Sequence, residues 1–445
     1  MKKFIQTIKN IFSIEDLRIR ILNTIGFLLI FRLGSFVVLP GVNPATIESG
    51  SNKDNILGLL DTLVGGAFSN VSIFGLGIMP YISASIVLQL LTFAVPYFQK
   101  LQKEGESGRK KINQITRVLT IVITLAQSVG YLAATVNSEM LFPGVDRAFF
   151  TITAMLILTA GTMFCMWLGE KITDKGIGNG ISMLIMVGII SRFPQAIVVE
   201  GAAKGMKGAL PFIIELAVLF FIVMGVVMLT QATRRIPVQY AKQVIGNKVY
   251  GGQRQYIPLK VIAAGVMPII FAQSIMFLPA MVASMFQDSS DLAGSIGATF
   301  SDFTSWQYNL TFAVLIILFT FFYTALSVNP NQIADDMKRN GGFIPGIKPG
   351  KQTSDYIDDV LSRITLPGAV FLAAIAILPA IAHVAGVTRD FSYFFGGTSL
   401  LIMVGVVLDT LQQIESYLLM RHYEGMMQSG RVRGRSENIP VSSSN

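Results

Sequence analysis

LGLLDTLVGGAFSNVSIFGLGIMPYISASIVLQLLTFAVPY, residues Leu57 to Tyr97, is the stretch that decides the fold of this chain. It is too apolar for an exposed loop and too interrupted for one ordinary membrane helix. Its first part, Asp61 to Ser72, is dense in small residues. A helix of a dozen residues would be roughly 18 Å long, a little over half of a ~30 Å hydrocarbon core. The second part, from Ile73, is long enough to cross the core.

The second part carries a mixed apolar and polar face. Ile82, Ser85, Ile86 and Gln89 have the i, i+3, i+4, i+7 spacing that places side chains on one side of a helix. Such a face suits a partly wet interior better than lipid. The pattern predicts a half-helix that enters a cavity from one side, followed by a span that lines it. A re-entrant packing element without a transport role is the alternative.

The composition is that of a helical membrane protein. Hydrophobic residues make up 52% of the chain, charged residues only 14%, and the mean hydropathy is +0.59. Apolar runs of about twenty residues recur, and the short alternating strands of a membrane barrel do not. The single cysteine, Cys165, excludes a disulfide within the chain and a thiolate metal site, so we expect it to serve packing.

The fold expected is an all-α multi-spanning membrane protein with ten spans in two inverted five-helix halves around a central pore. Residues 1–16 are predicted to form an interfacial helix with one apolar stripe. The first half covers 17–208 and the second 209–419, followed by a tail at 420–445. The predicted spans are 17–40, 73–95, 115–136, 149–168, 177–194, 209–230, 259–286, 308–328, 364–385 and 397–419.

The charge distribution supports this topology. Most of the 35 lysines and arginines fall on one side of the predicted membrane, which the positive-inside rule assigns to the cytoplasm. Both termini are then cytoplasmic. The exceptions are Lys53, Arg147, Arg192, Lys204, Lys207 and Arg389, together with Arg32 inside the first span.

Two cytoplasmic connections, 231–260 and 328–363, are much longer than a link between spans requires. They are polar, basic and punctuated by Gly and Pro, so each is predicted to be an ordered hairpin that projects from the membrane. Their charge could pair with RNA phosphates or with acidic protein surfaces. The simpler alternative is that they only obey the positive-inside rule.

Residues that carry chemistry are scarce. The chain has no metalloprotease motif and no P-loop, and its two histidines, His383 and His422, stand apart. Gly176 to Gly180 is glycine-rich but follows no strand, which favours a turn at a helix start. Four ionisable residues near spans could form an ion relay, but they are few and mostly near predicted span ends, which favours packing or snorkelling: Arg32, Glu215, Asp409 and Glu415. We expect no enzyme activity, no cofactor and no metal site.

Motifs spread over nearly the whole chain resemble the SecY family, the central subunits of the Sec protein-translocation channel. They are Gly66 to Ile86, Lys103 to Gly108, Met166 to Glu170, Gly176 to Ser182, Phe322 to Ala325, Asn329-Pro330, Phe343 to Gly346 and Phe395 to Leu401. The resemblance implies a channel that moves unfolded secretory proteins across the membrane and releases apolar segments sideways into lipid.

The resemblance also implies roles for individual residues. A plug on the outer side of the pore would consist of Asp61, Thr62, Leu63, Val64, Gly65, Gly66, Ala67, Phe68, Ser69, Asn70, Val71 and Ser72. A pore ring would consist of Ile82, Ile86, Ile185, Ile270 and Ile402. A lateral gate would involve Val87, Thr92, Gln127, Ser274 and Leu278, with Gln127 and Gln273 hydrogen-bonded across the closed seam. Docking of partners would involve Arg234, Arg235 and Lys348.

The partners implied are SecE-like and SecG-like small membrane subunits, the SecA motor ATPase, the ribosome with its RNA, precursors bearing signal sequences, and membrane lipid. The location implied is the bacterial inner membrane. Lys348 replaces the arginine usual in the family, which keeps the charge but loses the planar two-pronged donor. An ion-coupled secondary transporter, which also uses inverted halves, is the runner-up, and a membrane enzyme is the third alternative.

Overall fold

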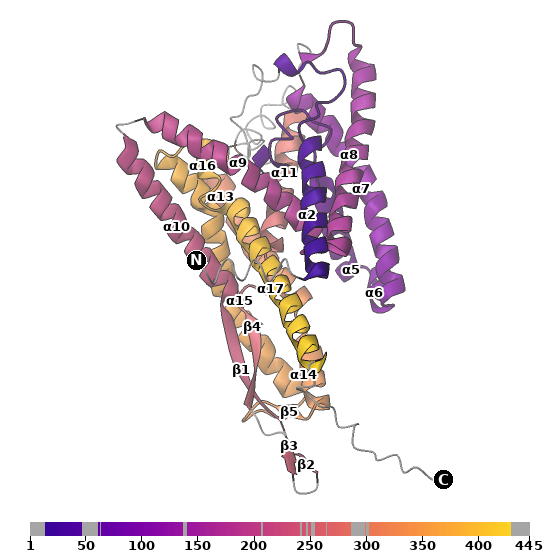
Figure 1. Cartoon of the computed structure of the whole chain (residues 1–445), viewed down its shortest axis with the longest axis vertical. Coiled ribbons are helices and arrows are strands. Elements are labelled where there is room, and N and C mark those ends of the chain that lie inside the picture. The colour runs from indigo at the N-terminus through magenta and orange to yellow at the C-terminus, as the bar shows by residue number, and fades with distance from the viewer. Residues whose placement is uncertain are drawn as a thin grey trace.

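The computed structural model describes residues 14–46, 61–62, 64–136, 140–205, 208–240, 243–245, 248–250, 254–263, 265–285, 299 and 302–428. The predicted interfacial helix at 1–16 and most of the predicted tail at 420–445 lie outside these residues. The fold is a bundle of long helices with a small sheet projecting from one end (Figure 1).

Each of the ten predicted spans overlaps one helix of the bundle. The helices of the first half are α2 (Glu15–Gly34), α5 (Met79–Ala94), α7 (Glu106–Thr135), α8 (Arg147–Lys175) and α9 (Gly180–Lys204). Those of the second half are α10 (Ala209–Gln231), α11 (Met267–Met285), α13 (Trp306–Ser327), α15 (Lys351–Val384) and α17 (Gly397–Gln428). Short helices are α6 (Pro96–Lys103), α14 (Pro330–Arg339) and α16 (Arg389–Ser392).

Seven helices within the described residues are long and apolar enough to cross a membrane, or eight if the bent pair α5 and α6 is one span. The pair bends by 101° where Pro96 begins α6. α2 is not among the seven because Arg18, Arg20 and Arg32 fall in every stretch of it long enough to cross a membrane. α11 contributes only a shorter apolar helix, Met267–Met276.

Local chemistry moves several helix ends away from the predicted spans. α5 begins at Met79 rather than at 73, because Gly77 has a φ of +53°, which is incompatible with a right-handed helix, and Pro80 favours a first turn. α9 begins after Asn179, whose side chain accepts from the backbone N–H groups of Ile181 (3.1 Å) and Ser182 (3.4 Å). The glycine-rich segment at 176–180 is therefore a turn at a helix start, as predicted.

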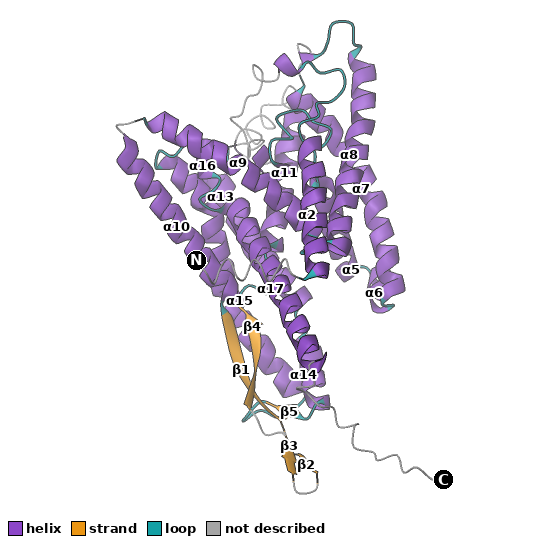
Figure 2. Cartoon of the chain, in the orientation of Figure 1, coloured by secondary structure: helices purple, strands orange, loops and turns teal. Residues whose placement is uncertain are grey.

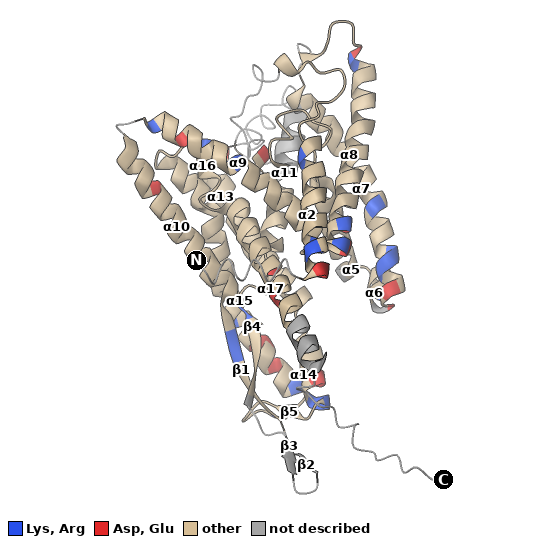
Figure 3. Ribbon diagram, in the orientation of Figure 1, with Lys and Arg blue, Asp and Glu red and all other residues tan. Residues whose placement is uncertain are grey.

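The two halves repeat the same packing order. In the first half α5 packs on α7, α7 on α8 and α8 on α9; in the second, α11 packs on α13, α13 on α15 and α15 on α17. α2 starts at the end that carries the sheet, where its acidic first turn lies, whereas α10 runs toward that end into the sheet (Figure 3). The halves are thus inverted. They meet where α9 contacts α10 and α17, and where α5 and α7 contact α11.

The two long connections form one structure rather than two separate hairpins. β1 (Thr233–Tyr240) pairs with β4 (Arg254–Lys260) from Thr233↔Lys260 to Gln239↔Arg254. The far end of β1 also pairs with β5 (Gly342–Phe343), which belongs to the second connection. β2 (Gln243–Ile245) and β3 (Lys248–Tyr250) form a separate small ladder (Figure 2). We call β1, β4, β5, α14 and the first turns of α15 the sheet module.

The sheet module has its own apolar core. Its buried members come from both connections: Ile236, Val238, Leu259, Met337, Ile344, Ile357 and Leu361. Alternation along β1 places Ile236 and Val238 on the buried face and Arg235 on the opposite, exposed face. Arg234 shares the face of Ile236 but lies nearer the start of the strand and is exposed. The module projects from one end of the bundle (Figure 2), and lysines and arginines mark β1, α14 and the start of α7 (Figure 3).

Candidate functional site: a central constriction and the segment that covers it

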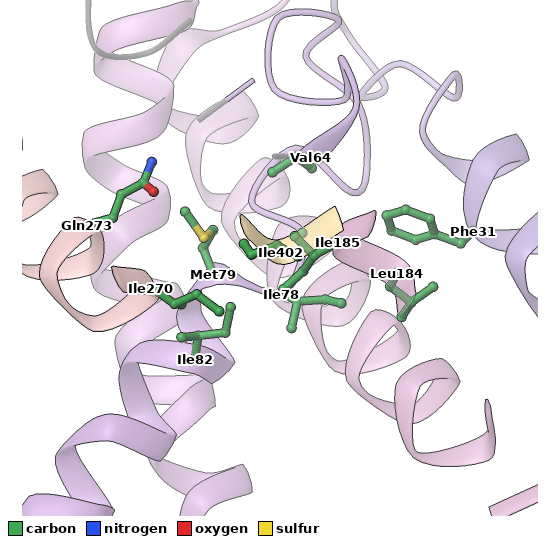
Figure 4. A pocket seen from close by; sticks show the side chains of 11 residues that line it. Phe31, Val64, Ile78, Met79, Ile82, Leu184, Ile185, Ile270, Gln273 and Ile402 are labelled. Carbon is green, nitrogen blue, oxygen red and sulfur yellow. The ribbon is translucent and has the colours of Figure 1, made fainter. Parts of the chain in front are cut away.

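A small apolar cavity lies where the two halves meet. Four of the five predicted ring isoleucines line it, each from a different helix: Ile82 on α5, Ile185 on α9, Ile270 on α11 and Ile402 on α17. The close view shows these side chains converging on one space (Figure 4). The cavity volume open to water is only about 20 Å³. Both halves therefore contribute to a single constriction.

The fifth predicted ring residue, Ile86, does not line the cavity. It lies one turn further along α5 and is buried in the same apolar cluster. Other residues that line the cavity were not in the predicted ring: Phe31, Val64, Gly77, Ile78, Met79, Leu184 and Gln273. Ile78 lies four residues before Ile82, the helical spacing that could have identified it.

The lining is chemically suited to exclusion rather than to binding. Gln273 contributes the one polar side chain among the lining residues. Its amide nitrogen and oxygen are buried and have no hydrogen-bond partner among the described residues, so the predicted seam bond from Gln273 is not formed. Branched aliphatic walls favour dewetting, which blocks ions without holding them.

The segment predicted to be a plug covers this cavity. Val64 lies on the opposite side of the cavity from Ile82 (Figure 4). Leu63 is outside the described residues. The predicted half-helix over 61–72 is wrong beyond Val64: the remaining residues form turns, because Gly65 and Gly66 have φ of +69° and +91°. Val71 also has a positive φ, +47°.

Polar groups from three helices fasten this segment. Asp61 forms an ion pair with Arg192 on α9. Arg32 on α2 donates to the carbonyl oxygen of Gly65 at 2.5 Å, and Tyr131 on α7 donates to that of Phe68 at 2.8 Å. Arg192 was predicted only as a charge on the outer side, and Arg32 only as an ionisable residue within the first span, because the partners of each are distant in sequence.

The remaining ionisable residues near spans do not form a relay. Glu215 pairs with Lys204, while Asp409 and Glu415 are exposed on α17. Arg32 instead contacts residues 61–72, which we call the plug segment. The described residues therefore offer no chain of titratable groups through the bundle.

The predicted gate residues lie on helices that meet at the seam between the halves. Thr92 is buried on α5 and donates to the Leu88 carbonyl at 2.7 Å. Gln127 is buried on α7, and Ser274 on α11 donates to the Ile270 carbonyl at 2.9 Å. Val87 is exposed. Leu278 belongs to α11, and its side chain is outside the described residues.

The predicted docking residues are exposed on the sheet module. Arg234 and Arg235 lie at the bundle end of β1, opposite Leu259 and Pro258 of β4. Lys348 lies in the turn before α15, where its carbonyl oxygen accepts from the Thr353 hydroxyl at 2.9 Å. The backbone of this turn is thus fixed while the lysine side chain faces solvent.

A family model described as SecY matches residues 72–411 of this chain. The chain belongs to the SecY family. The match begins at the end of the plug segment and runs through the constriction, the seam and the sheet module. It therefore covers most of the elements described above.

Sequence relatives extend the SecY match to nearly the full length. The chain is 43% identical to protein translocase subunit SecY of Streptomyces coelicolor, over 94% of this chain and 98% of the relative. It is 40% identical to protein translocase subunit SecY of Mycobacterium tuberculosis, over 96% of this chain and all of the relative.

Solved structures share the fold at lower identity. A structure of a protein-conducting channel matches with a TM-score of 0.64 at 14% identity, over 90% of this chain and 92% of that one. Sec61 in a canine ribosome–channel complex from the endoplasmic reticulum matches with a TM-score of 0.60 at 13% identity and the same coverage. A SecY structure whose plug domain stabilises the closed channel and maintains a membrane seal matches with a TM-score of 0.60 at 15% identity.

Proposed function

We propose that this chain is a protein-conducting channel that moves unfolded secretory proteins across a membrane and releases apolar segments sideways into lipid. The observation that carries the proposal is the constriction, where isoleucines from four helices of both halves close on a space that Val64 covers. Aliphatic side chains form no specific hydrogen bonds with a passing chain, so sequences of many kinds can slide through.

In this proposal Ile82, Ile185, Ile270 and Ile402 form the pore ring, and Ile86 supports it from the next turn of α5. Residues 61–72 are the plug. The role agrees with the related SecY structure in which a plug domain maintains a membrane seal. A transporter fits less well, because the cavity presents a single polar side chain where substrate ligands would be needed.

Sideways release would use the seam where α5 and α7 meet α11, at Val87, Thr92, Gln127, Ser274 and Leu278. A signal sequence passing this seam gains about 0.8 kcal/mol for each CH₂ group transferred to lipid. The polar contacts observed at the seam are bonds of Thr92 and Ser274 within their own helices. The parting of the halves therefore breaks apolar contacts more than hydrogen bonds.

Partners would supply the energy. Ribosomal RNA or an acidic face of the SecA motor would bind the exposed basic side chains of the sheet module, which are Arg234, Arg235 and Lys348. The related Sec61 structure is a ribosome–channel complex. SecE-like and SecG-like subunits would cover exposed apolar helices such as α10, and the complex would lie in the bacterial inner membrane with both termini cytoplasmic.

Crosslinking a stalled precursor tests the proposal. The channel complex is reconstituted with motor and ATP, and a photo-crosslinker replaces Ile82 or Ile402. We expect crosslinks to the arrested chain at both positions and none at Ile152, an exposed residue of α8 that faces away from the cavity. Crosslinks at Ile152 equal to those at Ile402, or failure to move any precursor, would contradict a central pore.

A further inference from the structure

A network of charged and hydroxyl groups fastens the plug segment to α9. The carboxylate of Asp61 accepts from the Arg192 guanidinium and, at 2.8 Å each, from the hydroxyl and the backbone N–H of Ser69. Arg192 Nη2 also donates to Ser69 Oγ at 3.0 Å. Asp61 thus closes the segment on itself and ties it to a helix of the bundle.

A second arginine holds the same segment from another helix. Arg32 on α2 donates to the Gly65 carbonyl oxygen at 2.5 Å. The side chains of Asp61 and Arg192 are only 13% and 23% exposed. Charge-assisted hydrogen bonds are stronger when water is largely excluded, so this network is a strong polar attachment in an otherwise apolar region.

The backbone of the segment is shaped to receive the arginine. A Cβ atom on Gly66 would lie 2.8 Å from Nη2 and 2.9 Å from Cζ of Arg192. The guanidinium therefore lies directly against the glycine, whose φ of +91° also excludes most side chains. The Arg192 guanidinium thus packs against Gly66 at the same place where it pairs with Asp61.

We propose that Asp61, Ser69 and Arg192, together with Arg32, form a plug latch that holds the segment over the constriction until a passing chain displaces it. This proposal rests on the proposed channel function and assigns four positioning residues to the closed state. Both arginines belong to the first half. Among the described residues, the segment approaches the second half through Val64, which lines the cavity with Ile270 and Ile402.

Because the latch lies within the first half, opening of the seam and release of the plug segment are two separate movements. Parting the halves at the seam between α5, α7 and α11 leaves Asp61, Arg32 and Arg192 on the same body. Release of the plug therefore needs its own displacement, which lateral opening does not supply.

The test measures the resting ion leak of proteoliposomes that contain the assembled channel complex without precursor. We expect Asp61→Asn and Arg192→Gln each to raise the leak roughly tenfold, since a hydrogen bond to a charged group changes a two-state population by about that factor. The double variant is expected to leak no more than the leakier single variant. The control is Glu170→Gln, which removes the carboxylate of an exposed ion pair with Arg117 in the same half.

The outcomes separate the latch from the channel. If wild type moves precursor while both single variants seal as tightly as wild type and Glu170→Gln, the latch is wrong and the channel stands. Multiplicative leaks in the double variant would also contradict a direct pair. A wild-type complex that moves no precursor contradicts the channel itself. If Asp61→Asn fails to assemble, Ser69→Ala carries the same test, because its backbone bond to Asp61 remains.

Discussion

At the residue scale, the constriction depends on aliphatic side chains that form no hydrogen bonds with water. Ile402 is buried and comes from the last long helix, yet it meets residues from α5, α9 and α11. The volume of the Ile402 side chain and its apolar character could each close the constriction. An informative pair of substitutions changes one of these properties and keeps the other. Threonine and valine do so, because they have nearly the same shape and differ by one hydroxyl.

We expect Ile402→Thr to raise the resting ion leak of the reconstituted complex several-fold, because the hydroxyl stabilises water in the constriction. Ile402→Val removes one methylene group, costs about 0.5 to 1.5 kcal/mol and keeps the wall dry. Its leak should stay close to that of wild type. Equal leaks in the two variants would show that volume, not polarity, closes the pore.

The seat of the plug segment depends on Gly65. A Cβ atom there would lie 2.7 Å from Cα of Gly188 on α9, and the φ of +69° adds strain. We expect Gly65→Ala to expose the buried position 72, so that a Ser72→Cys thiol reacts faster with a maleimide. Gly144→Ala is the control, because it has the same kind of φ, +95°, with nothing within 4 Å. A non-glycine residue at positive φ costs about 1 to 3 kcal/mol by itself. If the Ser72→Cys thiol reacts equally fast in the Gly65→Ala and Gly144→Ala backgrounds, the contact with Gly188 is not what seats the segment.

The sequence identified side chains that meet in an apolar cavity better than it identified polar contacts. Ile82, Ile185, Ile270 and Ile402 were assigned through the resemblance, and the structure brings them together. Arg192 was recognised only as a charge on the outer side. Its partner Asp61 is 131 positions away, and no local pattern connects them.

At the element scale, periodicity and length located the spans, whereas turns and pairings needed the three-dimensional structure. The half-helix at 61–72 was predicted from its length, its small residues and the family resemblance, and Gly65 and Gly66 end it early. The two projecting connections were predicted as ordered but separate. Their union depends on β5, which is only two residues long, and such a strand leaves no readable pattern in the sequence.

The shared core of the sheet module predicts that damage to one connection loosens the other. Ile344→Ala, in the second connection, should cost about 2 to 5 kcal/mol of local stability. We expect a nonspecific protease to cut the first connection, near residues 241–253, faster in this variant. Gln352→Ala, at an exposed position of the same connection, is the control. Unchanged cleavage in Ile344→Ala would mean that the connections are stable independently.

At the scale of the whole molecule, a buried charge cluster joins the two halves at the end away from the sheet. Glu200 on α9 is fully buried and accepts from the backbone N–H of Thr388 at 2.8 Å and from its hydroxyl. Lys204 pairs with Glu200 at 3.1 Å and also with Glu215 on α10. The cluster spans the short link from α9 to α10, which is the covalent connection between the halves.

We expect Lys204→Gln to destabilise the complex by about 3 to 5 kcal/mol, because it leaves Glu200 buried without its cation. The measurement is the thermal midpoint of the purified complex. Arg117→Gln, which breaks an exposed pair, should change stability by about 1 kcal/mol or less. A thermal midpoint for Lys204→Gln as high as that for Arg117→Gln would contradict a structural role for the cluster.

One helix connects the two ends of the molecule. α15 begins in the sheet module and continues for 34 residues, about 51 Å at 1.5 Å per residue, before the chain turns at Thr388 to reach Glu200. Its first turns pack in the sheet module, and its far end leads into the contact with α9 near the link between the two halves. Under the proposed function, a motor or ribosome that tilts the module would therefore move the junction of the two halves through this helix without touching the pore. Work done at the sheet module would in this way reach the opposite end of the bundle.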